Sequence, residues 1–392
     1  MEAGATEEEK DSVHTTVNVD TTLSTQQIYQ HDPLLILLKG KLHLNNLWIS
    51  AGATLLPGSV YLLAWLLWRV NEIKEWDNKD LLSLIIQTFI LFPFLSLIYT
   101  LIPNAIVKLF NTLATNGVIG HARKDRPGGE TYAAFKQQLV YWIDNSWWTV
   151  AITIVVVLYI LTRLFLRELP AQNNPIPYPL RAIVIIAYAP LMFATGMSVI
   201  RLVIVLIFTN RLFYFFTLQI QPIHPDGSGG LGILESLLWL CVGMMLWVVT
   251  LLIAMILVQK LSGLSYAEMF LLGAIYIALI PTLLIGWLIF PHRMMVQARN
   301  EALQPLMVEY QHALIQSLSS GTQDTQSIAA ETLHLETLKK RYDLVYNLFP
   351  VWPLDTNTLS RAGATVIIPI ILPLILPSTL SFISFLLQKF GL

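Results

Sequence analysis

The chain has 392 residues, of which 55% are hydrophobic and 12% are charged, and its formal net charge is −1. Soluble domains carry about 25% charged residues, so this composition excludes an ordinary soluble domain, and the near-neutral charge gives no reason to expect a nucleic-acid partner. The single cysteine, Cys241, excludes disulfides within the chain and cysteine-based metal clusters, and we predict no cofactor.

Long uncharged stretches predict an all-α, polytopic integral membrane protein, because a backbone inside lipid must satisfy its own hydrogen bonds. The acidic, threonine-rich residues 1–30 are expected to be disordered and are not a signal peptide. Residues 31–290 are predicted to form a membrane domain that begins with an interfacial helix at 31–46. Its spans are predicted near residues 47–68, 81–107, 147–166, 182–209, 231–258 and 269–290.

A polar loop between the second and third predicted spans contains an amphipathic pattern. Its apolar residues recur at spacings of three and four, at Tyr132, Phe135, Leu139 and Trp142. This spacing places them on one face of a helix. We expect that helix to lie flat on the membrane surface.

Residues 291–361 form the largest polar segment and contain two helical patterns on either side of a turn-rich break at 317–327. The apolar positions of the first pattern are Leu303, Met307, Tyr310 and Leu314, and those of the second are Leu335, Leu338, Tyr342, Val345 and Phe349. These spacings predict an antiparallel helical hairpin with a coiled-coil-like seam. A final proline-rich span at 362–388 brings the predicted count to about seven, and six or eight spans also fit.

The distribution of basic residues predicts the orientation in the membrane. Lys and Arg are more numerous on the face that holds the N-terminus, residues 111–145, the loop at 224–232 and the hairpin. The positive-inside rule therefore makes these segments cytoplasmic.

The sequence HPDGSGGLG at residues 224–232 is the first candidate for a functional site. Glycines let backbone amides approach a ligand, and a helix N-terminus follows, which together favour an anion. The candidate ligand-binding residues are His224, Asp226, Gly227, Ser228, Gly229 and Gly230. The alternative is a tight turn in which Asp226 caps the turn or the following helix. A metal site is disfavoured because one His and one Asp are too few ligands.

Two charges inside the predicted spans form a second candidate. Arg201 lies within the fourth span, where an arginine costs about 2.5–3.5 kcal/mol on insertion scales and usually faces a bundle interior. Glu235 lies in the first turns of the fifth span. We predict that the two residues pair or line a polar vestibule. The alternative is that Arg201 extends toward the headgroups.

The pattern at residues 224–232 resembles an HPDxxGGLG loop found between two spans of uncharacterised bacterial multi-pass membrane proteins. The resemblance covers this loop and the helices beside it. It implies a multi-pass protein of the bacterial inner membrane, and it carries no activity to this chain.

These features favour an oligomeric channel or transporter-like protein, because proline-broken spans, a buried arginine and a cytoplasmic hairpin suit a gated assembly. Its expected partners are the lipid bilayer and further copies of the chain. The first alternative is a membrane-anchored signalling or scaffold protein that binds a soluble partner through the hairpin. A membrane enzyme acting on a phosphate-bearing substrate is the weakest hypothesis, because no catalytic motif is present and no catalytic residue is predicted.

Overall fold

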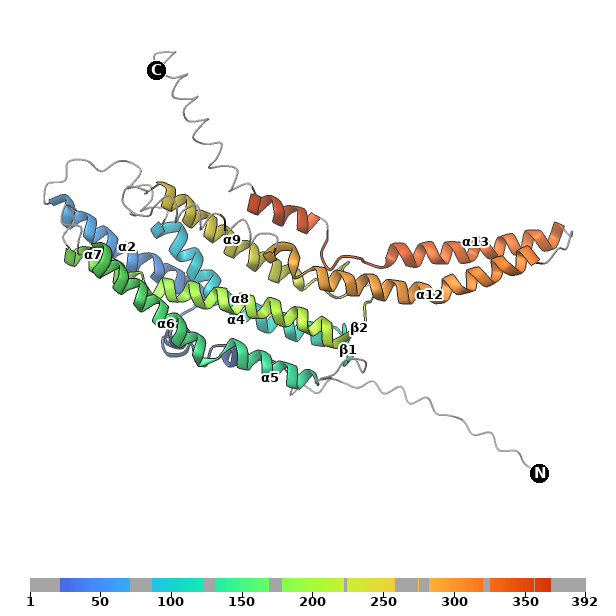
Figure 1. The fold of residues 1–392 in the computed structure, drawn as a ribbon, viewed down its shortest axis with the longest axis horizontal. Coiled ribbons are helices and arrows are strands. Elements are labelled where there is room, and N and C mark those ends of the chain that lie inside the picture. Colours follow the sequence, from blue (N-terminus) through green and yellow to red (C-terminus); the bar gives the residue numbers. More distant parts are fainter. Residues whose placement is uncertain are drawn as a thin grey trace, which may run out of the picture.

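The computed structural model shows an elongated helical bundle with a helical hairpin projecting from one end (Figure 1). The strands are confined to one small sheet among the described residues, so the predicted all-α class is confirmed. The structure describes residues 22–70, 87–122, 131–168, 178–221, 224–257, 274, 282–319, 325–355 and 357–367.

The bundle is built from helices that coincide with the apolar stretches of the sequence. They are α2 (Asn46–Val70), α4 (Phe92–Thr115), α5 (Tyr132–Ile143), α6 (Ser146–Leu161), α7 (Tyr178–Ala187), α8 (Ala189–Phe215) and α9 (Leu234–Leu257). Four stretches of the described residues are long and apolar enough to cross a membrane: Thr88–Thr115, Tyr132–Phe165, Ile185–Phe215 and Leu234–Leu251. The total of about seven spans stays a prediction.

Shorter elements extend or connect these helices. A 3-10 turn, η2 (Gln26–Ile28), precedes α1 (Pro33–Leu35). Wider π-helical turns form η3 (Ile36–Lys41), η4 (Gln87–Leu91), η5 (Thr162–Glu168) and η6 (Thr282–Gly286). Strands β1 (Ile119–Ala122) and β2 (Phe216–Leu218) pair antiparallel at the end of the bundle from which the hairpin projects (Figure 1).

The predicted span boundaries agree with these helices where the structure describes them. α2 covers 47–68, η4 and α4 cover 87–107, α6 and η5 cover 147–166, α7 and α8 cover 182–209, and α9 covers 234–257. Most of the span predicted at 269–290 lies outside the described residues. The last span, at 362–388, is described only to residue 367, and a helix covers 357–367.

The end of the segment expected to be disordered is packed against the bundle. Residues 1–21 lie outside the described residues, but Leu23 and Ile28 belong to the hydrophobic core. The side-chain amide of Asn111 on α4 accepts from the backbone N of Leu23 at 2.8 Å and donates to its carbonyl at 2.9 Å. Burial of Leu23 and Ile28 offsets the conformational entropy that this stretch loses when it becomes ordered. The prediction of disorder did not include that burial.

Within residues 31–46, α1 and η3 form one continuous helical run at 33–41, part of which is buried in the bundle. Asp32 caps α1, and Asp32 and Leu35 are fully buried within the bundle. Lys39 donates to the carbonyl of Thr100 at 2.8 Å.

The amphipathic helix predicted after residue 131 is present as α5, and the structure shows what its apolar face contacts. Thr131 caps its first turn by accepting from the backbone N of Ala134. Phe135 and Leu139 are fully buried, and the Phe135 ring packs against Phe208 of α8. The apolar face is therefore directed into the protein, while Tyr141 and Trp142 stay exposed.

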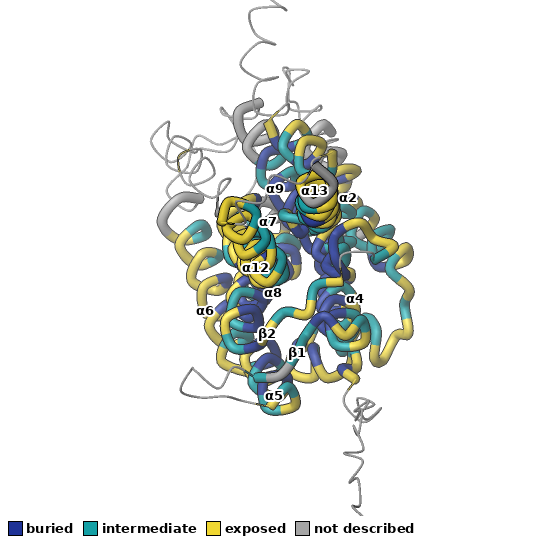
Figure 2. Tube along the Cα trace, turned by 90° about the vertical axis from the view of Figure 1, so that its right-hand side faces the viewer, coloured by how far each residue is buried: buried dark blue, intermediate teal, exposed yellow. Residues whose placement is uncertain are grey.

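α6 has the character of a lipid-facing helix. Only 11% of the most apolar window in Tyr132–Phe165 is buried, compared with 56% in Ile185–Phe215. A helix that is apolar yet exposed marks a membrane or protein contact, and Figure 2 shows exposed residues along α6. Its exposed apolar side chains, continued into η5, are Trp147, Val150, Ile154, Val155, Val157, Leu158, Tyr159, Leu161 and Phe165.

The predicted hairpin is present as α12 (Ile289–Ser319) and α13 (Thr325–Leu348), which lie side by side and project beyond the β1–β2 sheet (Figure 1). Leu303 of α12 and Leu338 of α13 are buried, at 3% and 2% exposed. The predicted face of α13 is the face that packs. On α12 the packed face runs through Leu306 and Ala313, while Met307 and Leu314 are exposed.

Candidate functional site

The HPD–glycine loop, residues 224–232, is organised around the carboxylate of Asp226. Oδ1 accepts from the backbone N of Ser228 at 2.9 Å and of Gly230 at 3.0 Å, and Oδ2 accepts from Gly232 N at 2.8 Å. His224 Nδ1 lies 2.7 Å from Oδ1. The candidate residues are thus brought together, with Asp226 at their centre.

Three glycines of this loop have a left-handed backbone that other residues rarely adopt: Gly227, Gly229 and Gly230, with φ of 64°, 67° and 93°. Two of them are also closely surrounded. A Cβ on Gly230 would lie 2.4 Å from Val118, and one on Gly229 would lie 2.6 Å from Ile220. The glycines therefore allow the loop to close tightly against the region around β1 and β2.

This geometry changes what the loop can bind. The backbone amides that would hold an anion already donate to Asp226, so the loop carries its own anion. Partial burial acts to raise the pKa of Asp226, but the amides of Gly232, Gly230 and Ser228, together with His224, outweigh it and lower that pKa below its ordinary value. The arrangement corresponds to the alternative interpretation, a turn that Asp226 caps.

The HPD–glycine loop lies at the root of the hairpin. A Cβ on Gly229 would also lie 3.1 Å from Pro350, which follows α13. Thr358 donates to Glu235 Oε1 at 3.3 Å, which links the start of α9 to the segment after the hairpin. His292 Nδ1 donates to the carbonyl of Val351 at 2.8 Å. These contacts fix the base of the hairpin to the bundle.

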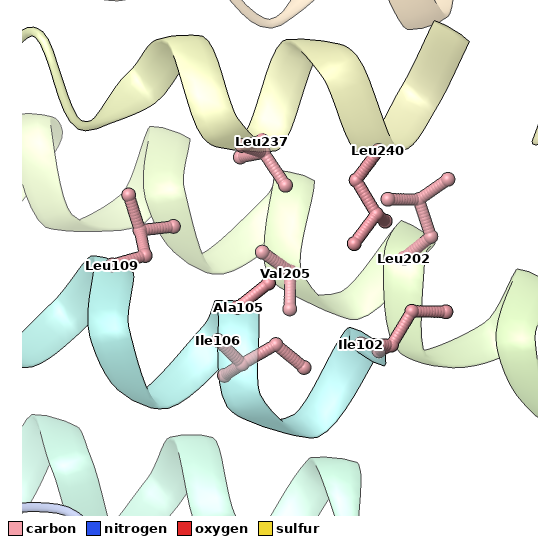
Figure 3. Close-up of a pocket in the computed structure, with 8 residues that line it drawn as sticks. All are labelled: Ile102, Ala105, Ile106, Leu109, Leu202, Val205, Leu237 and Leu240. Atoms are coloured by element: carbon pink, nitrogen blue, oxygen red, sulfur yellow. The ribbon is translucent and has the colours of Figure 1, made fainter. Parts of the chain in front are cut away.

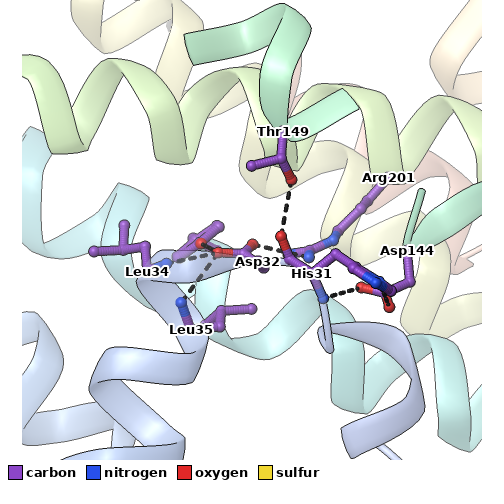
Figure 4. Close-up of polar contacts among 8 residues, drawn as sticks. His31, Asp32, Leu34, Leu35, Asp144, Thr149 and Arg201 are labelled. Atoms are coloured by element: carbon purple, nitrogen blue, oxygen red, sulfur yellow. Dashed lines mark hydrogen bonds and ion pairs between the residues drawn. The ribbon is translucent and has the colours of Figure 1, made fainter. Parts of the chain in front are cut away.

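A second polar site lies inside the bundle, where Arg201 of α8 pairs with Asp32 (Figure 4). Arg201 Nη2 is 2.8 Å from Asp32 Oδ2, and both side chains are 0% exposed. Asp32 Oδ1 accepts from the Tyr99 hydroxyl at 2.5 Å and from the backbone N of Leu34 and Leu35 at 3.1 Å each. Oδ1 thus accepts three hydrogen bonds, whereas Oδ2 has only its contact with Arg201, and Arg201 Nε and Nη1 have no hydrogen-bond partner among the described residues.

A second layer of polar contacts holds the same N-terminal segment from outside (Figure 4). Asp144, between α5 and α6, accepts from the backbone N of His31 at 2.9 Å, and its Oδ2 lies 2.7 Å from His31 Nδ1. Thr149 donates to the carbonyl of His31 at 3.0 Å. The side chain of His31 is 58% exposed and that of Asp144 is 5% exposed. The polar site is therefore buried at Asp32 and reaches the protein surface at His31.

The structure does not bring Arg201 and Glu235 together. Arg201 is buried inside the bundle and does not extend toward the headgroups. Its partner, however, is Asp32 and not Glu235. Glu235 is exposed and accepts from Trp239 Nε1 at 3.2 Å and from Thr358. Asp32 was missed because it precedes the spans; its signal was an Asp-Pro pair, a helix cap, directly before an apolar run.

A cavity in the core between the main helices is too small for a ligand (Figure 3). It holds about 10 Å³ between α4, α8 and α9, which is at the lower limit for one water. Its walls are apolar and consist of Ile102, Ala105, Ile106, Leu109, Leu202, Val205, Leu237 and Leu240. Among the described residues, no three His, Cys, Asp or Glu side chains gather to hold a metal ion.

The larger hollow lies on the hairpin. A groove of about 620 Å³ runs between α12 and α13. Its polar walls include Gln297, Asn300 and Gln304, and Met307 extends it toward the outer part of α12. Tyr342 and Tyr346 form its α13 side.

Comparisons of the chain with protein-family models, with curated proteins and with solved structures found no match. The resemblance of residues 224–232 to bacterial multi-pass membrane proteins stays a prediction, as does the bacterial inner membrane as the location.

Proposed function

We propose that the protein is a membrane-anchored scaffold that presents its hairpin to a protein partner. The observation that carries this proposal is the apolar surface of the hairpin, which stands clear of the bundle. Five large apolar residues of α12 are 38–79% exposed: Met307, Val308, Leu314, Ile315 and Leu318. One apolar face of α12 already packs against α13. A second apolar face that is exposed outside the membrane indicates a contact surface for a partner.

The rest of the molecule suits an anchor. Asp32 and Arg201 fasten the N-terminal segment inside the bundle, and the contacts of Pro350, Val351 and Thr358 fasten the base of the hairpin. The hairpin is therefore held at a fixed place while its outer part is available for binding. The positive-inside rule supports a cytoplasmic position for it.

A channel or transporter-like function is the second candidate. The observation in its favour is the set of π-helical turns in or beside the apolar helices, since such turns are frequent at functional sites. Ion flux through purified protein in liposomes would support this candidate. A phosphate-binding enzyme at the HPD–glycine loop is disfavoured, because Asp226 occupies the amides that would bind the phosphate.

The scaffold proposal predicts that the exposed face of α12 is covered in the native membrane. The single native thiol, Cys241, is fully buried, so Cys241→Ala gives a background for single-cysteine variants. In ruptured membranes, Leu318→Cys should react with a membrane-impermeant maleimide at least several-fold more slowly than Gln316→Cys, which lies on the opposite side of α12. Equal labelling rates would contradict the proposal.

A further inference from the structure

α12 carries two apolar faces, and the hairpin uses only one of them. The face packed against α13 consists of Leu303, Leu306, Tyr310, Ala313 and Ser317, which are buried or half-buried. The exposed face, which we call the α12 stripe, consists of Met307, Val308, Leu314, Ile315 and Leu318. With 3.6 residues per turn, the stripe is centred about a third of a turn away from the packed face.

The α12 stripe has the spacing of a helix-pairing surface. Met307 and Leu314 are seven residues apart, as are Val308 and Ile315, and Leu318 lies one turn beyond Leu314. A seven-residue repeat keeps a stripe facing a neighbouring helix. The stripe covers three turns, which is about 16 Å at 1.5 Å per residue.

The distribution of charge shows which side of the hairpin can be covered. From Ala302 to Ser319, α12 has Glu309 as its single Asp, Glu, Lys or Arg, and Glu309 lies on the side away from the stripe. On α13 the charged residues are Glu331, Glu336, Lys339, Lys340, Arg341 and Asp343. Interface cores are depleted of charged residues, so this part of α12 offers the less charged contact surface, although α13 also exposes apolar side chains such as Leu333 and Leu344.

We infer that the α12 stripe pairs with the α12 stripe of a second copy of this chain. In a two-fold pairing, residues near the axis face their own equivalents, so a charge there would face a like charge. The stripe places no such charge at the contact. Two copies in one membrane also carry their hairpins on the same face and at the same height, so identical stripes meet in register.

The size of the stripe fits a contact between membrane-anchored copies. Stable interfaces between soluble proteins bury about 1,200–2,000 Å², and three turns of one helix fall short of this. Anchoring in a common membrane raises the effective concentration of the second stripe and makes a small contact sufficient. A freely diffusing partner would lack that advantage. This inference rests on the proposed function, since it names the partner that covers the hairpin.

Disulfide formation between copies tests the pairing directly. In the Cys241→Ala background, mild oxidation of native membranes should link Leu318→Cys chains into dimers, whereas the matched Gln316→Cys chains stay monomeric. Adding Val308→Glu to the Leu318→Cys chain should lower the dimer fraction at least several-fold, because like charges then meet at the axis. Val308 is 45% exposed, so this change leaves the packing of the hairpin intact.

The outcomes separate this inference from the scaffold proposal. If Leu318→Cys is protected from maleimide but forms no dimer, another partner covers the stripe, and the pairing inference fails while the scaffold proposal stands. If Leu318→Cys is labelled as fast as Gln316→Cys, both fail. Equal dimer formation by the two variants would indicate random collision and would also overturn the pairing.

Discussion

At the scale of single residues, the pair of Asp32 and Arg201 determines where the N-terminal segment lies. Neither group can be buried alone without a large desolvation cost. Their 2.8 Å contact, with the Tyr99 hydroxyl and two backbone amides on the same carboxylate, compensates part of that cost. The ion pair therefore specifies one docking position for the segment, while the apolar side chains beside it, including Leu35, supply the favourable burial.

Double-mutant analysis should reveal this coupling. Arg201→Met or Asp32→Leu alone leaves an unpaired buried charge, which costs about 3–5 kcal/mol, whereas the double variant should lose much less than the sum. Thermal unfolding in mild detergent measures the difference. Lys340→Met is the control, because Lys340 and Glu336 are exposed and 4.0 Å apart, so its effect should stay below about 1 kcal/mol. Additive losses for the buried pair would contradict the coupling.

The buried ion pair could be predicted only in part from the sequence. An arginine within an apolar helix has to be buried against an acid or extend to water, so the importance of Arg201 could be predicted. Its partner could not, because several acids precede or follow the spans, and helix periodicity says nothing of contacts between distant segments. Glu235 was the nearest acid along the neighbouring spans, but it begins its helix on an exposed face.

At the scale of elements, the HPD–glycine loop is a turn closed by Asp226 that precedes α9 and supports the hairpin base. Its hydrogen bonds depend on an ionised Asp226, whose pKa is lowered by the amides of Gly232, Gly230 and Ser228 and by His224, against the opposing effect of burial. Because the folded pKa lies below the unfolded one, the carboxylate stabilises the loop at pH values above its ordinary pKa. That contribution is lost as the pH falls through the lowered pKa.

Amide hydrogen exchange should report this loss. The amides of Ser228, Gly230 and Gly232 should be protected at neutral pH and lose protection when the pH falls below about 3.9, the ordinary pKa of aspartate. In Asp226→Asn the same amides should exchange faster at neutral pH and show no such transition. A loss of one cap is worth about 0.5–2 kcal/mol, so protection should fall roughly two- to thirty-fold. Unchanged protection in the variant would contradict the role of Asp226.

Elements were more predictable than their contacts. Apolar runs and proline positions located the described helices, because hydrogen bonding in lipid permits few alternatives. In the hairpin, the period of α13 identified its packed face, but α12 offers two apolar faces of similar spacing. Ala313, a small residue that allows close approach, lies on the packed face, whereas the spacing of the large apolar residues alone favours Met307 and Leu314.

At the scale of the whole molecule, aromatic residues indicate where the bilayer begins. Tyr141, Trp142 and Trp147 are 67%, 45% and 74% exposed around the break between α5 and α6, and such residues favour the membrane–water interface. Asp144 in this break contacts His31, next to Asp32. The buried ion pair therefore lies near the level of one interface, and we infer that α5, β1, β2 and the hairpin project beyond it.

Helix length agrees with this placement. The apolar stretch Ile185–Phe215 has 31 residues, which is about 46 Å of helix, while the hydrocarbon core is about 30 Å thick. A helix of this length must either tilt strongly or extend beyond the lipid. Burial of its second half against α5 and the sheet region favours extension.

Spin labels should locate the boundary. In the Cys241→Ala background, a label at Val155→Cys should be relaxed mainly by oxygen, which concentrates in lipid, and a label at Tyr141→Cys mainly by a water-soluble nickel complex. Val155 and Tyr141 are similarly exposed, at 64% and 67%, so a difference reports depth rather than burial. Identical accessibility at the two positions would place the bilayer elsewhere.

The docked N-terminal segment has a consequence for the order in which the molecule is made. His31 leaves the ribosome before its partner Asp144, which is 113 residues further along the chain. At ~5–20 residues per second, roughly 6–20 seconds separate their synthesis. Arg201 appears later still, so the segment cannot form its buried ion pair until α8 has been made, while α9 follows later in the chain.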